Sequence, residues 1–306
     1  MREYDAVVIG GGPAGMTAAL YLLRAGVRTA MIEKLSPGGQ VLLTSEIENY
    51  PGFPEGLQGW ELSDKFSAHL DNYELDRIND EVRSITVGKT IHEIAVGDEV
   101  VGAKVIVLAS GARYRKLGVP GEDRLLGRGV SYCALCDGNF FRDREVAVVG
   151  GGNSALEEAL YLARLCSKVH LIHRRDEFRG LFCYQDKCFK HDKINVIRST
   201  VVEEIVGGDD LEALALKNVK TGEKSRLELD GCFIFVGFEP IMDFVPEDVK
   251  RDPNGILTDQ EMRTSVPGIF AAGDIRSKMC RQVATAVGDG ATAATAAFSY
   301  LEQMGY

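Results

Sequence analysis

A helix needs about 18 consecutive apolar residues to cross a bilayer. The sequence has no uninterrupted apolar run of that length, so we expect no membrane span. Near the N-terminus only Ala6 to Ile9 form an apolar run, and acidic residues precede it, so a signal peptide is not expected. The chain also lacks an excess of positive charge. Its formal net charge of −10 argues against a nucleic acid as partner.

Cysteine is scarce and odd in number, with seven residues spread over a chain of 306. That usage excludes a small disulfide-stapled protein and favours a reducing, cytoplasmic compartment. Apolar residues make up 45% and charged residues 26%, which excludes a disordered chain. The length predicts two domains. Glycine, by contrast, is abundant: 34 residues exceed the average share of roughly 7%.

Much of the glycine falls in an internal repeat that relates residues 5–34 to residues 145–174. Each copy has an apolar run, a glycine-rich turn, an expected amphipathic helix that contains Ala-Leu-Tyr-Leu, and a second apolar run. This pattern is typical of a βαβ unit with parallel strands. The sequence therefore predicts an α/β fold with two Rossmann-like dinucleotide-binding domains.

Three small residues in each repeat have distinct expected roles. The first permits the tight turn out of the strand, the second lets the backbone approach a pyrophosphate, and the third lets the helix pack closely on the strand. These positions are Gly10, Gly12 and Gly15 in the first repeat and Gly150, Gly152 and Ala155 in the second. The pyrophosphate is then expected at the helix N-terminus. Glycine turns without a ligand are the disfavoured alternative.

The residues that end the second expected strand of each repeat indicate different ligands for the two sites. Glu33 ends the first, and a carboxylate there accepts hydrogen bonds from a free ribose and repels a 2′-phosphate. The second ends in residues 173–179, which contain three arginines suited to a 2′-phosphate. The first site therefore fits FAD or NAD and the second NADP, while a solvated basic face is the alternative for the arginines.

A third segment, near the C-terminus, favours FAD for the first site. Residues 268–274 are expected to form a short strand and a turn ending in Asp274, before a helix over roughly residues 282–303. An aspartate there can bind the ribitol of a flavin, although a simple helix cap is the alternative. We therefore expect a discontinuous FAD domain of residues 1–113 and 243–306, with a NADPH domain of residues 114–242 inserted in it.

The inserted segment also carries Cys133 and Cys136, which are close enough in sequence to form a redox disulfide. The neighbouring carboxylate of Asp137 can exchange the proton that thiolate chemistry needs. The competing interpretation is a zinc site completed by Cys183, Cys188 or His191, but their spacing is irregular and we expect no metal. The remaining cysteines, expected in the core, are Cys166, Cys232 and Cys280.

Taken in order along the chain, these motifs are similar to those of the low-molecular-weight thioredoxin reductases, from end to end. The motifs are GGGPAG at 10–15, PGGQ at 37–40, ENYPG at 48–52, CALCDG at 133–138, HRRDEFR at 173–179, Gly273-Asp274 and RQVA at 281–284.

The resemblance implies an NADPH-dependent, homodimeric flavoenzyme that reduces thioredoxin. It implies that Cys136 is the sulfur next to the flavin, Cys133 the one that attacks thioredoxin, and Asp137 the proton donor. The implied FAD-binding residues are Gly10, Gly11, Gly12, Pro13, Ala14, Gly15, Glu33, Lys34, Gly39, Gln40, Asn49, Val82 (through its backbone), Gly273, Asp274, Arg281, Gln282 and Val283. The implied NADPH-binding residues are Gly150, Gly152, Asn153, Ser154, His173, Arg174, Arg175 and Arg179.

Three other functions remain open from the sequence. The first is the same chemistry on a glutaredoxin-like or peroxidase-linked acceptor. The second is a ferredoxin–NADP-type reductase, which needs no cysteine pair and is therefore disfavoured by Cys133 and Cys136. The third is a non-catalytic NADPH sensor.

Overall fold

The structure is a computed structural model that describes residues 1–43, 47 and 49–305. The chain separates into two compact units, one formed by Met1–Arg113 with Glu239–Tyr306 and the other by Tyr114–Phe238. The second unit is thus an insertion in the first. The second junction lies at 238–239, a few residues before the expected 242–243. Residues 239–242 therefore belong to the first unit.

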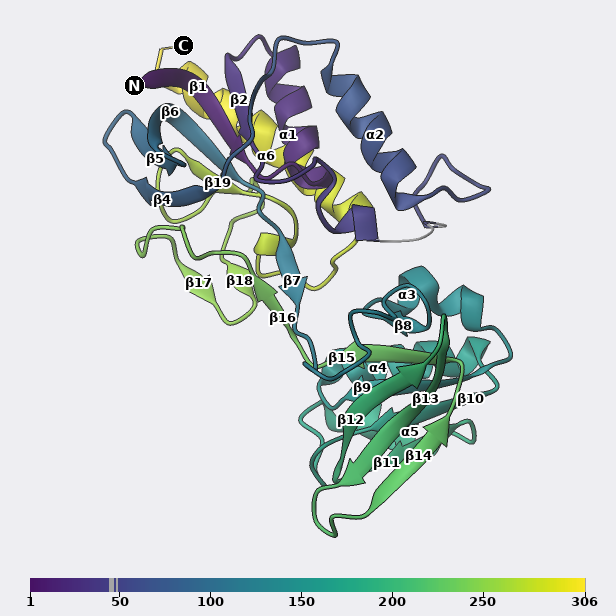
Figure 1. Cartoon of the computed structure of the whole chain (residues 1–306). Helices are drawn as coiled ribbons and strands as arrows, with labels where there is room; N and C mark the ends of the chain where they lie inside the picture. Colours follow the sequence, from purple (N-terminus) through teal and green to yellow (C-terminus); the bar gives the residue numbers. More distant parts are fainter. Residues whose placement is uncertain (44–46, 48, 306) are drawn as a thin grey trace. The chain divides into compact units, whose positions relative to one another are not determined.

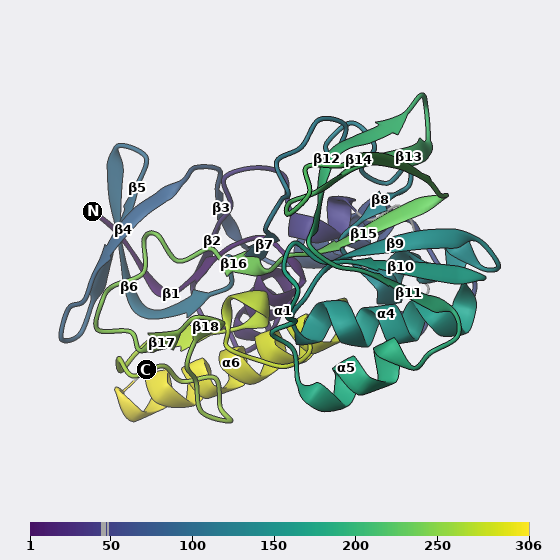
Figure 2. The same cartoon turned by 90° about the horizontal axis from the view of Figure 1, so that it is seen from below.

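The first unit is built on a seven-stranded sheet in the order β3-β2-β1-β6-β5-β4, with β19 paired to β6. Figure 1 labels these strands except β3, which is labelled in Figure 2. The strands of this sheet are β1 (Arg2–Ile9), β2 (Thr29–Ile32), β3 (Asp76–Ile78), β4 (Val82–Thr86), β5 (His92–Val96), β6 (Glu99–Leu108) and β19 (Ile269–Ala271). The helices are α1 (Pro13–Arg24), α2 (Gly59–Leu70) and α6 (Val283–Gln303), with short 3-10 turns η1 (Gly39–Leu43) and η3 (Gly273–Ile275). The small strands β17 (Arg251–Asp252) and β18 (Gly255–Ile256) pair with each other.

Strand β1 shows why the sheet is covered on both faces. Its side chains alternate between two apolar clusters: Ala6 and Val8 pack with α1 and α6, whereas Val7 and Ile9 pack into the opposite cluster. Alternate residues of a strand point to opposite faces, so β1 is apolar throughout because both of its faces are buried.

The second unit contains a five-stranded sheet in the order β11-β10-β9-β15-β8 and a three-stranded antiparallel sheet β12-β13-β14. Its strands are β8 (Val130–Ser131), β9 (Glu145–Gly150), β10 (Lys168–Ile172), β11 (Ile194–Ile197), β12 (Thr200–Gly207), β13 (Leu211–Asn218), β14 (Lys224–Glu228) and β15 (Gly231–Phe235). Its helices are α3 (Ala134–Asp137), α4 (Asn153–Leu165) and α5 (Phe182–Phe189), with the turn η2 (Gly138–Phe141). The crossings between the units are β7 (Ala112–Tyr114) and β16 (Phe238–Pro240), which form a two-stranded sheet.

Two apolar clusters hold the layers of the second unit together. Val146 and Val148 of β9 pack against α4 and α5, whereas Ala147 and Val149 face β12 and β13. Figure 2 shows the helices α4 and α5 on one side of the central strands and the antiparallel sheet on the other.

Both predicted βαβ units are confirmed. In the first, β1 and β2 are parallel, with Val8 opposite Met31, and α1 connects them. In the second, β9 and β10 are parallel, with Val148 opposite Leu171, and α4 connects them. The fold is α/β with two Rossmann-like units, as the sequence predicted.

Candidate functional site

The first glycine turn leads from β1 into α1 and leaves the helix N-terminus open. A Cβ at Gly15 would lie 1.8 Å from the carbonyl oxygen of Gly10, so helix and strand approach too closely for any side chain. A Cβ at Gly12 would meet no heavy atom within 4 Å. No side chain of the described residues caps α1, which begins at Pro13. Free N–H groups at an open helix N-terminus suit a phosphate.

The residues expected beside this turn lie around it. The Glu33 carboxylate accepts hydrogen bonds from the N–H of Gly11 at 2.7 Å and of Leu35 at 2.9 Å. Gly38 donates its N–H to the carbonyl of Gly11 at 2.7 Å, which brings the 37–40 loop against the turn. A Cβ at Gly39 would lie 3.4 Å from the Cα of Gly12.

The C-terminal segment closes on the same turn. Gly273 has φ +79°, and a Cβ there would lie 2.8 Å from that of Ala14. Asp274 follows, and its Oδ1 atom is buried and accepts no hydrogen bond from the described residues, although the ammonium of Lys278 lies 3.4 Å from it. Burial raises the pKa of Asp274, while Lys278 and Arg281 oppose that rise. A buried acceptor in this position fits a hydroxyl donor such as the ribitol of FAD.

The remaining residues expected at the flavin site lie at the rim of this region. Asn49 donates from Nδ2 to Oε1 of Gln282 at 3.1 Å, and Gln282 caps α6, in which Val283 is the first residue. Lys34 forms an ion pair with Glu81, the residue that precedes Val82, with 3.3 Å between Nζ and Oε1. Arg281 donates to the backbone carbonyls of Asn254, Arg276 and Lys278. Gln40 is exposed in η1, and Glu48, in the ENYPG motif, lies outside the described residues.

The second glycine turn, in the other unit, repeats the arrangement. A Cβ at Gly150 would lie 2.4 Å from the carbonyl oxygen of Phe235 and 2.6 Å from the Cβ of Ala155. A Cβ at Gly152 would meet nothing within 4 Å, and no described side chain caps α4. This helix N-terminus is therefore open to an anion in the same way.

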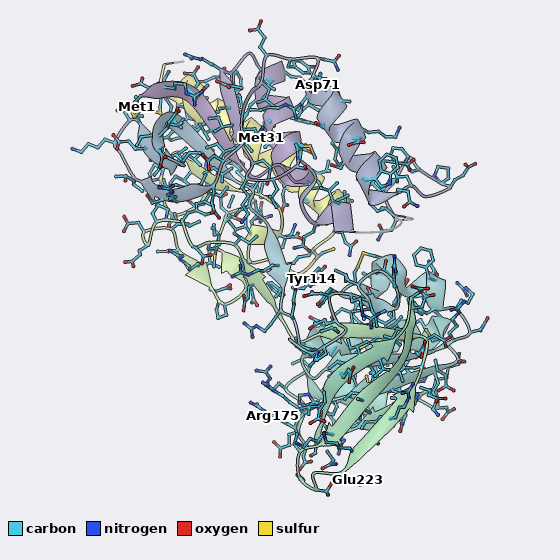
Figure 3. All side chains as sticks on the ribbon, in the orientation of Figure 1. Met1, Met31, Asp71, Tyr114, Arg175 and Glu223 are labelled. Carbon is cyan, nitrogen blue, oxygen red and sulfur yellow. A yellow bond between two sulfur atoms is a disulfide. The ribbon has the colours of Figure 1, made fainter. Side chains whose placement is uncertain are left out.

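The segment after β10 folds back over this turn. Arg179 and Gly180 donate their N–H groups to the carbonyl of Gly151, at 2.8 and 3.1 Å. Asn153, the first residue of α4, accepts the N–H of Leu181 at 2.8 Å. The three arginines of this segment, Arg174, Arg175 and Arg179, are all exposed, and so is Ser154. Figure 3 labels Arg175 among the side chains that project from the surface of the second unit.

His173 differs from the arginines that follow it. It is 6% exposed, and its ring lies so close to Gly151 that a Cβ there would be 2.3 Å from ring atoms. Burial lowers the pKa of His173, and the adjacent arginines lower it further. A neutral His173 packed beneath the loop supports the turn, and the charge of the cluster comes from the arginines.

The cysteine pair lies at the start of α3. Cys133 and Cys136 form a disulfide with a Cα–Cα distance of 5.3 Å. Cys133 is the N-cap residue of α3, and its Sγ accepts the N–H of Cys136 at 3.2 Å. The helix start therefore fixes both sulfurs by local backbone geometry, and both residues are partly exposed.

Asp137 follows the pair directly and is held by Ser131. The Ser131 hydroxyl donates to Oδ2 of Asp137 at 2.6 Å, and Oδ1 is buried without a hydrogen-bond partner among the described residues. Burial raises the pKa of Asp137, and the bond from Ser131 limits the rise. A carboxyl group that retains its proton more readily than usual beside two sulfurs can supply a proton to a thiolate.

The other cysteines behave differently. Cys166 and Cys232 are buried, as expected for core residues, but Cys280 is exposed because it lies in the loop before α6, so the expectation for Cys280 was wrong. In α5, Cys183 is exposed and Cys188 buried. Within the described residues, no three His, Cys, Asp or Glu side chains are grouped as a metal site requires, and no helix is both long and apolar enough for a bilayer.

The sequence pattern of the pyridine nucleotide-disulphide oxidoreductases matches residues 4–290. The chain belongs to this family. It is 46% identical to the thioredoxin reductase of Listeria monocytogenes over 99% of this chain and 95% of that one. It is 43% identical to the thioredoxin reductase of Bacillus subtilis, over 99% and 96% of the two chains. Full-length similarity at this level indicates a disulfide reductase of the thioredoxin reductase type, and the family implies the use of a flavin and NADPH.

A solved structure is equally similar. The crystal structure of the thioredoxin reductase from Streptococcus pyogenes has a TM-score of 0.93 and 45% identity, with 98% of this chain and 99% of that chain covered. The two open helix N-termini, the buried acceptor of Asp274 and the exposed arginines are features that fit the cofactors this family uses.

Sequence reasoning missed several polar residues that the structure places beside the site. Ser131 holds Asp137, and Lys278 and Asp289 surround Asp274. Asp289 is 9% exposed in a helix otherwise rich in small residues. An isolated acidic residue in such a helix was the available signal, because a buried carboxylate requires a partner.

Proposed function

We propose that this protein is a thioredoxin reductase that passes electrons from NADPH through FAD to Cys133 and Cys136, and from there to the disulfide of thioredoxin. The observation that carries the proposal is the Cys133–Cys136 disulfide next to the partly buried Asp137, in a chain that also has two open dinucleotide turns. We further propose a cytoplasmic homodimer with one tightly bound FAD in each subunit.

The first unit supplies the proposed flavin site. Gly10 to Gly15 leave the helix N-terminus open for the pyrophosphate, and Glu33 is proposed to receive the ribose hydroxyls. Asp274 offers its buried Oδ1 to the ribitol, and Asn49, Gln282 and Arg281 order the surrounding loops. A flavin held by these residues would supply two-electron transfer between NADPH and the Cys133–Cys136 disulfide.

The second unit supplies the proposed coenzyme site. Gly152 and the N-terminus of α4 receive the pyrophosphate of NADPH. Arg174, Arg175 and Arg179 provide the positive charge that a 2′-phosphate requires, and arginine forms strong paired hydrogen bonds with phosphate oxygens. The Asp176 carboxylate accepts a hydrogen bond from the Ser199 hydroxyl and forms an ion pair with Lys220. Its negative charge is therefore offset by Lys220 and does not neutralise these arginines.

The thiol chemistry follows from the order of the two sulfurs. Two electrons and one proton, the equivalent of the hydride that NADPH gives up, break the Cys133–Cys136 bond and leave Cys133 as a thiolate and Cys136 as a thiol. The Cys133 thiolate then attacks a sulfur of the thioredoxin disulfide, forming a mixed disulfide and releasing the other thioredoxin sulfur as a thiolate. Asp137 supplies the proton that this thiolate takes up. Cys136 then gives its proton to the Asp137 carboxylate and attacks Cys133 as a thiolate, which restores the original disulfide. The second thioredoxin sulfur leaves as a thiolate and is protonated from solvent, so thioredoxin is released in its reduced form.

The test replaces Cys133 with Ser and measures the two halves of the reaction separately. We expect flavin bleaching by NADPH to survive and thioredoxin-dependent turnover to disappear, because the attacking sulfur is gone while the coenzyme site is intact. Turnover that persists with thioredoxin would contradict the role of Cys133. The wild-type assay is repeated with NADH, and an equal kcat/KM for both coenzymes would contradict the arginine assignment.

The acceptor is tested in the same assay. A glutaredoxin-like protein and a peroxidase-linked protein replace thioredoxin at equal concentration, and we expect thioredoxin to give the highest kcat/KM. A protein that bleaches with NADPH but reduces none of these acceptors would instead support the NADPH sensor.

A further inference from the structure

Four charged side chains form a largely buried group beneath the turn at Gly273 and Asp274. They come from η3, from the loop after it and from α6, and all belong to the first unit. The four are Asp274, Arg276, Lys278 and Asp289. The side chains of Arg276, Lys278 and Asp289 are only 13%, 10% and 12% exposed, so this is not a surface ion pair.

Asp289 is the centre of the group. Its Oδ1 is 2.8 Å from Nη1 of Arg276, and its Oδ2 accepts hydrogen bonds from Lys278 Nζ at 3.0 Å and from the N–H of Gly273 at 3.1 Å. A buried carboxylate is tolerated only when it is paired and hydrogen-bonded. Asp289 meets this condition and, through the N–H of Gly273, binds α6 directly to the turn that carries Asp274.

Lys278 lies between the two carboxylates. Besides Asp289, its Nζ donates to Oγ1 of Thr285 at 3.3 Å and is 3.4 Å from Oδ1 of Asp274. Arg276 and Lys278 balance the two carboxylates of this group when all four are ionised, and Arg281, whose charge also acts on Asp274, adds a further positive charge nearby. Loss of Asp289 makes the surroundings of Asp274 more positive by one charge, and loss of Lys278 makes them more negative by one charge.

We propose that Asp289 and Lys278 are positioning residues of the flavin site, which hold the Asp274 turn and set the net charge that the bound flavin experiences. This inference rests on the proposed function, in which Asp274 binds FAD. Reduction adds negative charge to the flavin. An excess of local positive charge therefore raises the flavin midpoint potential, and an excess of negative charge lowers it.

The test uses two variants of nearly unchanged shape, Asp289→Asn and Lys278→Met, in the full-length protein. Midpoint potentials are measured by equilibration with a reference dye, and FAD affinity by reconstitution of the apoprotein. We expect Asp289→Asn to raise the potential and Lys278→Met to lower it. Both should weaken FAD binding by about 10-fold, because each removes charge-assisted hydrogen bonds that hold the turn.

The charge explanation predicts further results. The double variant Asp289→Asn/Lys278→Met has the same net charge as the wild type, so its potential should return towards the wild-type value although its FAD affinity stays low. Lys278→Arg keeps the charge and should leave the potential unchanged. The control is Lys190→Met, which removes the exposed partner of Asp186 in the other unit and should change neither quantity.

Potentials that shift in the same direction in both single variants, or not at all, would overturn the inference and leave these residues a purely structural role. Should Asp289→Asn fail to fold, the contrast between Lys278→Met and Lys278→Arg decides alone. Wild-type protein that holds FAD and reduces thioredoxin upholds the proposed function whatever the variants do. Wild-type protein that binds no FAD would overturn both.

Discussion

At the scale of single residues, the proposed proton donor Asp137 is also a carboxyl group whose burial affects stability. Burial raises its pKa and the hydroxyl of Ser131 lowers it. We expect Asp137→Asn to reduce thioredoxin-dependent kcat by about 10²–10⁴-fold, the range for loss of a general acid. Flavin reduction by NADPH should be unchanged, since it needs no proton from this residue. Single-turnover kinetics of each half-reaction check the prediction.

The pH dependence of Asp137 has a definite sign. A carboxyl whose pKa is raised by folding contributes stability that is present below its unfolded pKa and lost as the pH rises through the folded pKa. Urea unfolding at pH values from below the unfolded pKa to above the folded pKa of Asp137 should therefore show Asp137→Asn gaining stability relative to wild type as the pH rises. In Ser131→Ala the pKa of Asp137 rises further, so the alkaline limb of turnover should move to higher pH. An unchanged limb would contradict the proton-donor role.

The sequence identified residues whose roles depend on local motifs, and it missed those whose roles depend on distant contacts. The exposure of Arg174 and Arg175 follows from their position after a buried strand. His173 belongs to the same motif but is buried against Gly151, which only the fold of the loop determines. Asp289 obtains its partners from the η3 turn and the loop after it, a pairing that no periodicity reveals.

At the scale of elements, the repeat predicted the parallel units well because strand and helix periodicities are local. The helix expected over roughly residues 282–303 is α6, Val283–Gln303. The strand before the first crossing is β6, Glu99–Leu108, whose first half pairs with β5 in an antiparallel arrangement that the repeat does not reveal. The antiparallel sheet β12-β13-β14 was not predicted, because its strands are fixed by pairing with each other and by packing on the central sheet.

The contact between α1 and α6 gives a matched pair of glycines for a test. A Cβ at Gly290 would lie 2.2 Å from the carbonyl oxygen of Ala14, whereas a Cβ at Gly288 would meet nothing within 4 Å. We expect Gly290→Ala to destabilise the protein by about 1–3 kcal/mol or more, because backbone must move. Gly288→Ala should stabilise it by up to about 1 kcal/mol through helix propensity. Urea unfolding checks both, and equal effects would contradict the close approach of α6 to α1.

At the scale of the whole molecule, the division of the chain matches the division of its apolar core. The clusters around β9 and β15 draw their residues only from the second unit, and those around β1 and β6 only from the first. The second unit is continuous in sequence. The first unit needs two elements from the end of the chain, β19 to complete its sheet and α6 to cover it. The two units should therefore differ in their ability to fold alone.

We expect residues 114–238, produced as a separate chain, to fold cooperatively and to bind NADP⁺ more tightly than NAD⁺, because the apolar clusters, the open turn at Gly152 and the arginines all lie within them. Residues 1–113 alone should not fold, since without α6 the apolar residues of α1 and β1 that it covers are exposed.

Circular dichroism during urea unfolding measures cooperativity, and calorimetry measures coenzyme binding. A fragment 114–238 that unfolds without a transition would show that its core depends on the first unit. A folded fragment without preference for NADP⁺ would instead separate the stability of this unit from the proposed role of its arginines.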